Sequence, residues 1–169
     1  MIHLVGAALV AGGCGWLGFQ AAEELRKKAC GLRQMAQSLL LLERELELGE
    51  PPLQQLLERV AERSSGPAKE LLEECRRGLF RLECEDFSSL WRRQVESREV
   101  FGKEGQAILL PLGDLLGRYD GHAQGEGAAA ARRALEELAG RLEEERRHRG
   151  RVYQALGLSG GAFLVILLL

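Results

Sequence analysis

The sequence has few of the residues that favour β-sheets. Aromatic residues make up 5% of the chain, and no segment shows strand-like alternation of apolar and polar residues with β-branched and aromatic enrichment. Apolar residues instead recur every three or four positions through most of the chain, as on one face of a helix. The sequence therefore predicts an all-α fold, an antiparallel helical bundle of about six helices.

The sequence also lacks the patterns that carry catalysis or bind a cofactor. None of its three histidines stands beside a nucleophile or a set of metal ligands. Asp120 with His122 could handle a proton, but a turn and its cap explain this pair better. The glycines from Gly13 to Gly18 match G-x-G-x-x-G without the strand and the later acidic residue of a dinucleotide site. We therefore expect no enzyme and no catalytic, cofactor or metal site.

The four cysteines form no C-x-x-C motif and have no histidine at a metal-ligand spacing. We expect them to be free, buried thiols in a reducing compartment.

The net charge of the chain is -2, without the excess of basic residues that a nucleic-acid-binding domain carries. We therefore expect no nucleic acid partner.

The last 18 residues, 152–169, contain no charged side chain. As a helix they would be about 27 Å long, close to the roughly 30 Å hydrocarbon core of a bilayer. This segment is predicted to be a C-terminal membrane anchor, with a buried helix of a soluble core as the alternative. Gly157 and Gly161 stand four residues apart, a spacing that lets membrane helices pack closely.

Residues 1–19 are also uncharged and rich in Val, Ala, Leu and Gly. We expect an N-terminal membrane anchor here, in which Ala7, Ala11 and Gly15 would form a small-residue face for helix packing. A cleaved signal peptide is the alternative, but no positive charge precedes the apolar run.

Between the two predicted anchors, residues 20–151 hold every Lys, Arg, Asp and Glu of the chain. Basic residues lie next to both apolar runs, on the side of this central region. By the positive-inside rule the central domain is expected in the cytosol, with both termini pointing out of it. The basic residues are Arg26, Lys27, Lys28, Arg33, Arg146, Arg147, Arg149 and Arg151.

Apolar periodicity and turn residues divide the central region into helices. A long helix is predicted for 20–48, and shorter ones are expected to begin after Pro52, Pro67 and Asp86. A fifth covers 103–116, where Pro111 either introduces a kink or marks a later start. The glycine-rich residues 117–127 are expected to form a loop. A final helix then leads into the C-terminal anchor.

Several short segments occur in an order typical of one known family. They are Trp16 to Phe19, Leu42 to Leu46 followed by Gly49 and Pro52-Leu53, Trp91, Leu116-Gly117 with Asp120 and Gln124, and Leu156-Gly157 with Gly161 and 165–168. In these residues the chain resembles the stage III sporulation protein AB family, whose members are similar to cytoplasmic domains of type II secretion and type IV pilus platform proteins. Pro111 and the added Gly125, Gly127 and Ala128 to Ala131 depart from the family pattern.

The resemblance implies a platform protein in the mother-cell membrane facing the forespore. It also implies a secretion-type ATPase and other components of a sporulation channel complex as partners, with a homo-oligomer possible. We hypothesise that the corner after the first helix, with the acidic residues before it, binds a partner: Glu43, Glu45, Glu47, Glu50, Pro52 and Leu53. The alternative is a membrane-tethered regulator that binds a soluble signalling protein.

Overall fold

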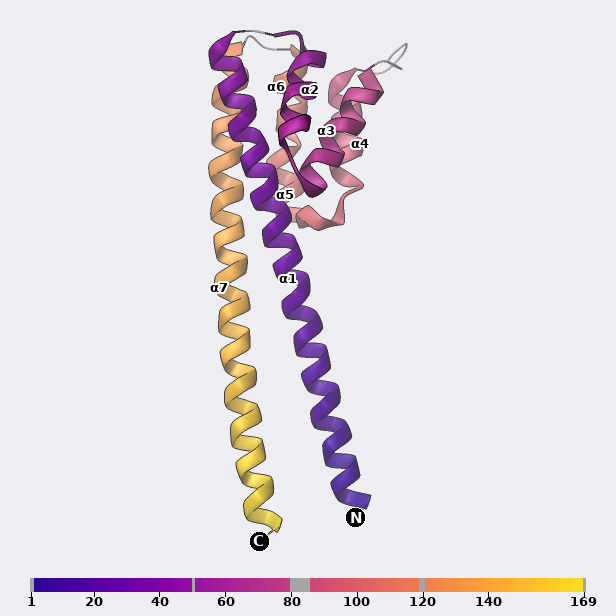
Figure 1. Cartoon of the computed structure of the whole chain (residues 1–169), viewed down its shortest axis with the longest axis vertical. Helices are drawn as coiled ribbons and strands as arrows, with labels where there is room; N and C mark the ends of the chain where they lie inside the picture. Colours follow the sequence, from indigo (N-terminus) through magenta and orange to yellow (C-terminus); the bar gives the residue numbers. More distant parts are fainter. Residues whose placement is uncertain (1, 50, 80–85, 119–120, 169) are drawn as a thin grey trace. The chain divides into compact units, whose positions relative to one another are not determined.

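The computed structural model describes the backbone of residues 2–49, 51–79, 86–118 and 121–168. Side chains are described for residues 20, 22–49, 51–79, 86–116 and 122–148. These ranges contain helices and no strand, so the all-α prediction is confirmed (Figure 1). The helices are α1 (Ile2–Leu48), α2 (Leu53–Arg63), α3 (Gly66–Leu79), α4 (Phe87–Glu96), the 3-10 helix η1 (Glu99–Phe101), α5 (Gly102–Leu109), α6 (Pro111–Arg118) and α7 (Gly121–Leu168).

The chain divides into two compact units. The central unit comprises residues 28–140, and the terminal unit comprises residues 1–27 and 141–169. One boundary between the units falls inside α1 and the other falls inside α7. The predicted anchors, 1–19 and 152–169, lie within the helical bounds of α1 and α7 but outside the residues whose side chains are described. In the part of the chain with described side chains, no helix is both long enough and apolar enough to cross a bilayer.

The core of the central unit is built from the apolar faces that the sequence periodicity predicts. From α1 it takes Leu32, Met35, Leu39, Leu42 and Leu46, each less than a tenth exposed. The other helices contribute further buried side chains: Leu56, Leu57, Val60, Leu71, Leu72, Cys75, Leu90, Trp91, Val95, Leu109, Leu112, Leu116, Leu135 and Leu138. Removing this apolar surface from water supplies the main driving force for folding.

In the central unit α1 to α4 run in alternating directions, and α5 and α6 run in the same direction as each other (Figure 1). The α2–α3 turn lies against α1. There the hydroxyl of Ser38, a buried residue, donates to the backbone oxygen of Gln34 and lies 2.7 Å from the hydroxyl of Ser64. Gly66 begins α3 with φ +57°, and a Cβ at this position would collide with the side-chain amide of Gln34. The positive φ favours glycine here, and any larger residue would also have to displace the flexible end of Gln34.

The predicted cap of α4 is confirmed. The carboxylate of Asp86 accepts a hydrogen bond from the backbone N–H of Ser89 at 3.1 Å, satisfying one of the free amides of the first turn. A cap of this kind stabilises a helix by about 1 kcal/mol.

Pro111 ends one helix and begins another, which decides between the two alternatives that the sequence left open. Proline has no N–H to continue the ladder of α5, and it suits the first position of α6. The N–H of Gly113 bonds to the carbonyl of Leu110, so the carbonyl of Leu109 receives no bond from it. The indole Nε1 of buried Trp91 donates to that carbonyl at 2.8 Å. A tertiary contact thus compensates for the break in the helix.

The predicted loop over 117–127 is wrong for residues 121–127, which belong to α7. Glycine disfavours helices, but tertiary packing overrides this preference here. A Cβ on Gly127 would collide with Cδ1 of Leu115, so glycine at this position leaves room for the Leu115 side chain of α6. Ala128, the next residue, is fully buried.

The cysteines only partly match the expectation of buried, free thiols. Cys75 is free and buried, and burial raises the pKa of its thiol to about 12. Cys30 is free but exposed, so the prediction was wrong for this residue because it occupies the polar face of α1. Cys14 and Cys84 lie outside the residues whose side chains are described.

Candidate interaction surface

Glu43, one of the acidic residues predicted to bind a partner, is held in an ion pair within the chain. Its carboxylate accepts a hydrogen bond from Nε of Arg132 on α7 at 2.8 Å. Arg132 also contacts Glu136 one turn further along α7, at 3.2 Å. The hydrogen bond that Arg132 donates to Glu43 is the main cause that raises the pKa of Arg132, followed by the one that it donates to Glu136. Glu43 therefore joins α1 to α7.

Glu45 is also paired, but with a different helix. Its carboxylate lies 3.1 Å from Nη1 of Arg59 and 3.4 Å from Nη1 of Arg63, both on α2. The side chain of Glu45 is 11% exposed. At about 100° per residue, positions 43 and 45 lie on nearly opposite sides of a helix. The predicted acidic surface is therefore split, with Glu43 directed at α7 and Glu45 at α2.

Glu47 is exposed, and the residues with described side chains offer it no ion pair. Leu48, which ends α1, is 85% exposed and is the large apolar side chain of the described set that water contacts most. Pro52 is exposed at the N-cap position of α2, where its carbonyl accepts from the N–H of Leu56 at 3.0 Å. Leu53 begins α2 and is half-buried. An exposed corner thus follows α1.

The remaining predicted site residues cannot be placed in this surface. Glu50 lies outside the described residues. The same holds for the side chains of the proposed membrane-packing residues, which are Ala7, Ala11, Gly15, Gly157 and Gly161. The partner-binding and membrane-packing roles stay predictions.

A groove of about 450 Å³ lies in the central unit, between the last turns of α1 and the first turns of α7. It is lined by Glu43, Leu46, Glu47, His122, Gly125, Glu126 and Ala129. These α7 residues were not predicted, because the sequence indicated a loop there. The i,i+4 pair His122 and Glu126 was the available signal for a helix.

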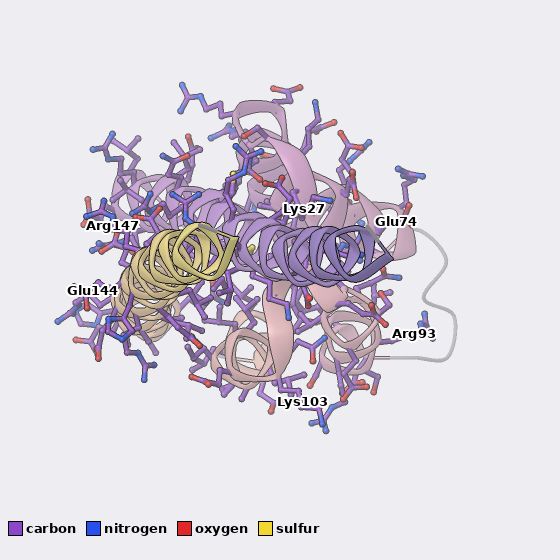
Figure 2. The ribbon with its side chains drawn as sticks, turned by 90° about the horizontal axis from the view of Figure 1, so that it is seen from below. Lys27, Glu74, Arg93, Lys103, Glu144 and Arg147 are labelled. Atoms are coloured by element: carbon purple, nitrogen blue, oxygen red, sulfur yellow. The ribbon has the colours of Figure 1, made fainter. Side chains whose placement is uncertain are left out.

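The groove concentrates charge of one sign, unlike other parts of the central unit. Figure 2 shows Glu74, Arg93 and Lys103 directed outward from α3, α4 and α5, so charges of both signs occur on these helices. The groove holds the three carboxylates Glu43, Glu47 and Glu126, with Arg132 beside the first. Among the described residues, no group of His, Cys, Asp and Glu side chains converges closely enough to hold a metal ion.

Comparisons with known proteins point to one family. A model of the stage III sporulation protein AB family matches residues 3–169. Stage III sporulation protein AB of Bacillus subtilis (strain 168) is 23% identical over 172 residues, with all of both chains covered. A solved structure of a Stage III sporulation protein AB aligns with a TM-score of 0.61 at 20% identity, covering 72% of this chain and 98% of that one.

The described part of the chain is all-helical, and the solved relative shares this fold. By the match over nearly its whole length, the chain belongs to the stage III sporulation protein AB family. The resemblance predicted from the sequence is confirmed.

Proposed function

We propose that this protein is a membrane-anchored platform of a sporulation-specific, secretion-like complex that links the mother cell and the forespore. In this proposal residues 1–19 and 152–169 are the anchors, and the central domain lies in the cytosol and docks a partner ATPase. Membership of a sporulation protein family supports the part of the proposal that assigns the protein to sporulation. The protein acts by contact and catalyses no reaction itself.

One observation carries the proposal more than any other. Each of the two long helices contains an uncharged apolar segment about as long as a bilayer is thick, and also a part of the buried core of the central unit. α1 contributes residues 2–19 and the core residues from Leu32 to Leu46, and α7 contributes residues 152–168 and the core residues Leu135 and Leu138. Anchors continuous with a packed helical domain suit a scaffold that transmits force or holds partners in place.

The docking surface in this proposal is the corner after α1, with Glu47, Leu48, Pro52 and Leu53. A solvent-exposed leucine beside a carboxylate that has no ion pair among the described side chains offers one apolar and one charged contact to a partner. Interaction sites commonly combine exposed apolar surface with a polar rim, and in this proposal Leu48 supplies the apolar contact and Glu47 the polar one. Glu43 and Glu45 support this surface by fixing α1 to α7 and α2.

The experiment is co-purification of the sporulation ATPase with the tagged full-length protein from sporulating cells. We expect the ATPase to be recovered with the wild type and to be reduced with Leu48→Asp combined with Glu47→Lys. The matched control is Glu62→Lys on the exposed surface of α2, which should recover the ATPase as the wild type does. Absence of the ATPase from the wild-type complex after crosslinking, with only monomers found, would favour the membrane-tethered regulator instead.

A further inference from the structure

The carboxylates of the groove between α1 and α7 differ in how far they are already neutralised. Glu43 has Arg132 at 2.8 Å, whereas Glu47 has no ion pair among the described residues. In the part of the chain with described side chains, the charged partner of Glu126 is His122 at 3.7 Å, and both side chains are more than three-quarters exposed. Glu47 and Glu126 therefore leave the rim of the groove negative.

The apolar residues of the groove lining are Leu46, Gly125 and Ala129, and they are less exposed than Glu47 and Glu126. A Cβ on Gly125 would meet no atom within 4 Å, in contrast to Gly127, where it would collide with Leu115. Glycine in a helix costs about 1 kcal/mol relative to alanine. No packing contact of the described chain explains that cost at Gly125, so the space above it is free for a group from outside.

An apolar floor below a negative rim fits one kind of side chain best. Lysine and arginine lay an aliphatic stem along apolar surface and keep a cationic head in polar surroundings. A metal ion does not fit, because the described carboxylates do not converge on one point. An anion would be repelled by Glu47 and Glu126. The ion pair of Arg132 with Glu43 shows that carboxylates at this edge of α1 accept a guanidinium group.

We propose that this groove binds a lysine or arginine side chain of the partner ATPase. The inference rests on the proposed function and extends it by naming the chemistry of the contact. The cationic head lies between Glu47 and Glu126, and the stem covers Gly125 and Ala129. The exposed Leu48 follows Glu47 in the chain and supplies an apolar contact beside the ion pairs.

The test is binding of the purified ATPase to the full-length protein in lipid nanodiscs, measured by interferometry. Gly125→Leu fills the groove, and Glu47→Lys with Glu126→Lys reverses its charge. Each is expected to weaken binding by about tenfold or more at about 0.15 M salt. Wild-type binding is expected to weaken as salt is raised to about 1 M, and the charge-reversed variant is expected to lose that dependence.

The chain offers a matched control for each change. Gly140 also lies in α7, and a Cβ there would meet nothing within 4 Å, yet this glycine does not line the groove. Gly140→Leu should therefore bind as the wild type does. Glu137→Lys changes the charge of an exposed α7 residue away from the groove, and it too should leave binding unchanged. Circular dichroism of every variant checks that the helical content is kept.

The outcomes separate the two proposals. Binding of the ATPase to the wild type, with equal binding of Gly125→Leu and of the charge-reversed variant, would overturn the role of the groove and leave the platform function standing. No binding of the ATPase to the wild type would overturn both. Equal loss with Gly140→Leu and Gly125→Leu would also overturn the groove, because the effect would then not depend on its position.

Discussion

Nε of Arg132 lies 2.8 Å from a carboxylate oxygen of Glu43, joining α7 to α1 between residues 89 positions apart in the sequence. The two side chains are 22% and 12% exposed, so water screens this pair less than an ordinary surface pair. The contact also fixes the two helices whose ends form the groove. It should therefore stabilise the central unit more than the median surface ion pair does.

The first prediction concerns this ion pair. Glu43→Gln and Arg132→Gln should each lower the free energy of unfolding, and the double variant should lose less than the sum of the two. We expect a coupling energy of about 1 kcal/mol, at the upper end for exposed pairs. Chemical denaturation of the four proteins of the cycle measures it. Additive effects of the two substitutions would show that the pair contributes nothing.

The second prediction concerns the hydrogen bond across the α5–α6 break. Trp91→Phe removes the N–H that bonds to the carbonyl of Leu109 but keeps an aromatic ring in the core. The variant should lose about 1 to 3 kcal/mol, because a buried carbonyl is left without a donor and the smaller ring leaves space. Thermal unfolding followed by circular dichroism measures the loss. An unchanged midpoint would mean that the carbonyl of Leu109 accepts a hydrogen bond from another donor in the variant.

The third prediction separates two costs of replacing glycine. Gly66 and Gly102 have φ of +57° and +63°, but a Cβ would collide with Gln34 at Gly66 and meets nothing within 4 Å at Gly102. At Gly102, where ψ is 169°, the backbone lies in a region that is essentially restricted to glycine, so Gly102→Ala should cost about 1 to 3 kcal/mol by conformation alone. Gly66→Ala adds the contact with the Gln34 side chain to its conformational cost, and Gln34→Ala should remove that added part. Denaturation of Gly66→Ala with and without Gln34→Ala tests this, and an equal cost of Gly66→Ala in both backgrounds would contradict it.

The fourth prediction is a pH dependence caused by Cys75. Burial raises the pKa of its thiol from 9.0 to about 12. Between these values the unfolded chain has released the proton that the folded chain keeps, so this contribution to stability is complete below pH 9 and is lost as the pH rises toward 12. The loss is about 1.4 kcal/mol per pH unit.

The comparison for Cys75 is with Cys75→Ala, measured at matched pH values above and below pH 9. The stability difference between wild type and variant should shrink as the pH rises, while exposed Cys30→Ala should show no such trend. A constant difference for Cys75→Ala across this range would show that the thiol ionises equally in both states.

Much of the fold could be predicted because periodicity records which face of a helix is buried. The heptad positions from Leu32 to Leu46 form the α1 side of the core, and Asp86 caps α4 as its residue type suggests. Pro111 marks a helix boundary, but the sequence left open whether it kinks one helix or begins another. The choice between them depends on Trp91, a residue distant in the sequence whose contact no local pattern reveals.

The candidate site was harder to predict, and glycine explains the main error. Gly121, Gly125 and Gly127 indicate a loop by local propensity, yet they lie in α7. Gly127 is needed for close packing on Leu115, which is a tertiary reason invisible in the sequence. Glu43, Glu45 and Glu47 lie near the end of α1, in the long helix that the sequence predicts there. Their division between α7 and α2 depends on which helices pack on each side.

Labelling of Cys30 with a maleimide that does not cross membranes tests the platform topology most directly. Cys30 is exposed in the central unit, whereas buried Cys75 stays a protonated, unreactive thiol. Cys14→Ser and Cys84→Ser remove the other two thiols, and a cysteine added at either terminus reports the outer side. We predict that Cys30 is labelled only after the cells are permeabilised, while the terminal cysteines are labelled in intact cells. Labelling of Cys30 in intact cells would contradict a cytosolic platform domain held by two membrane anchors.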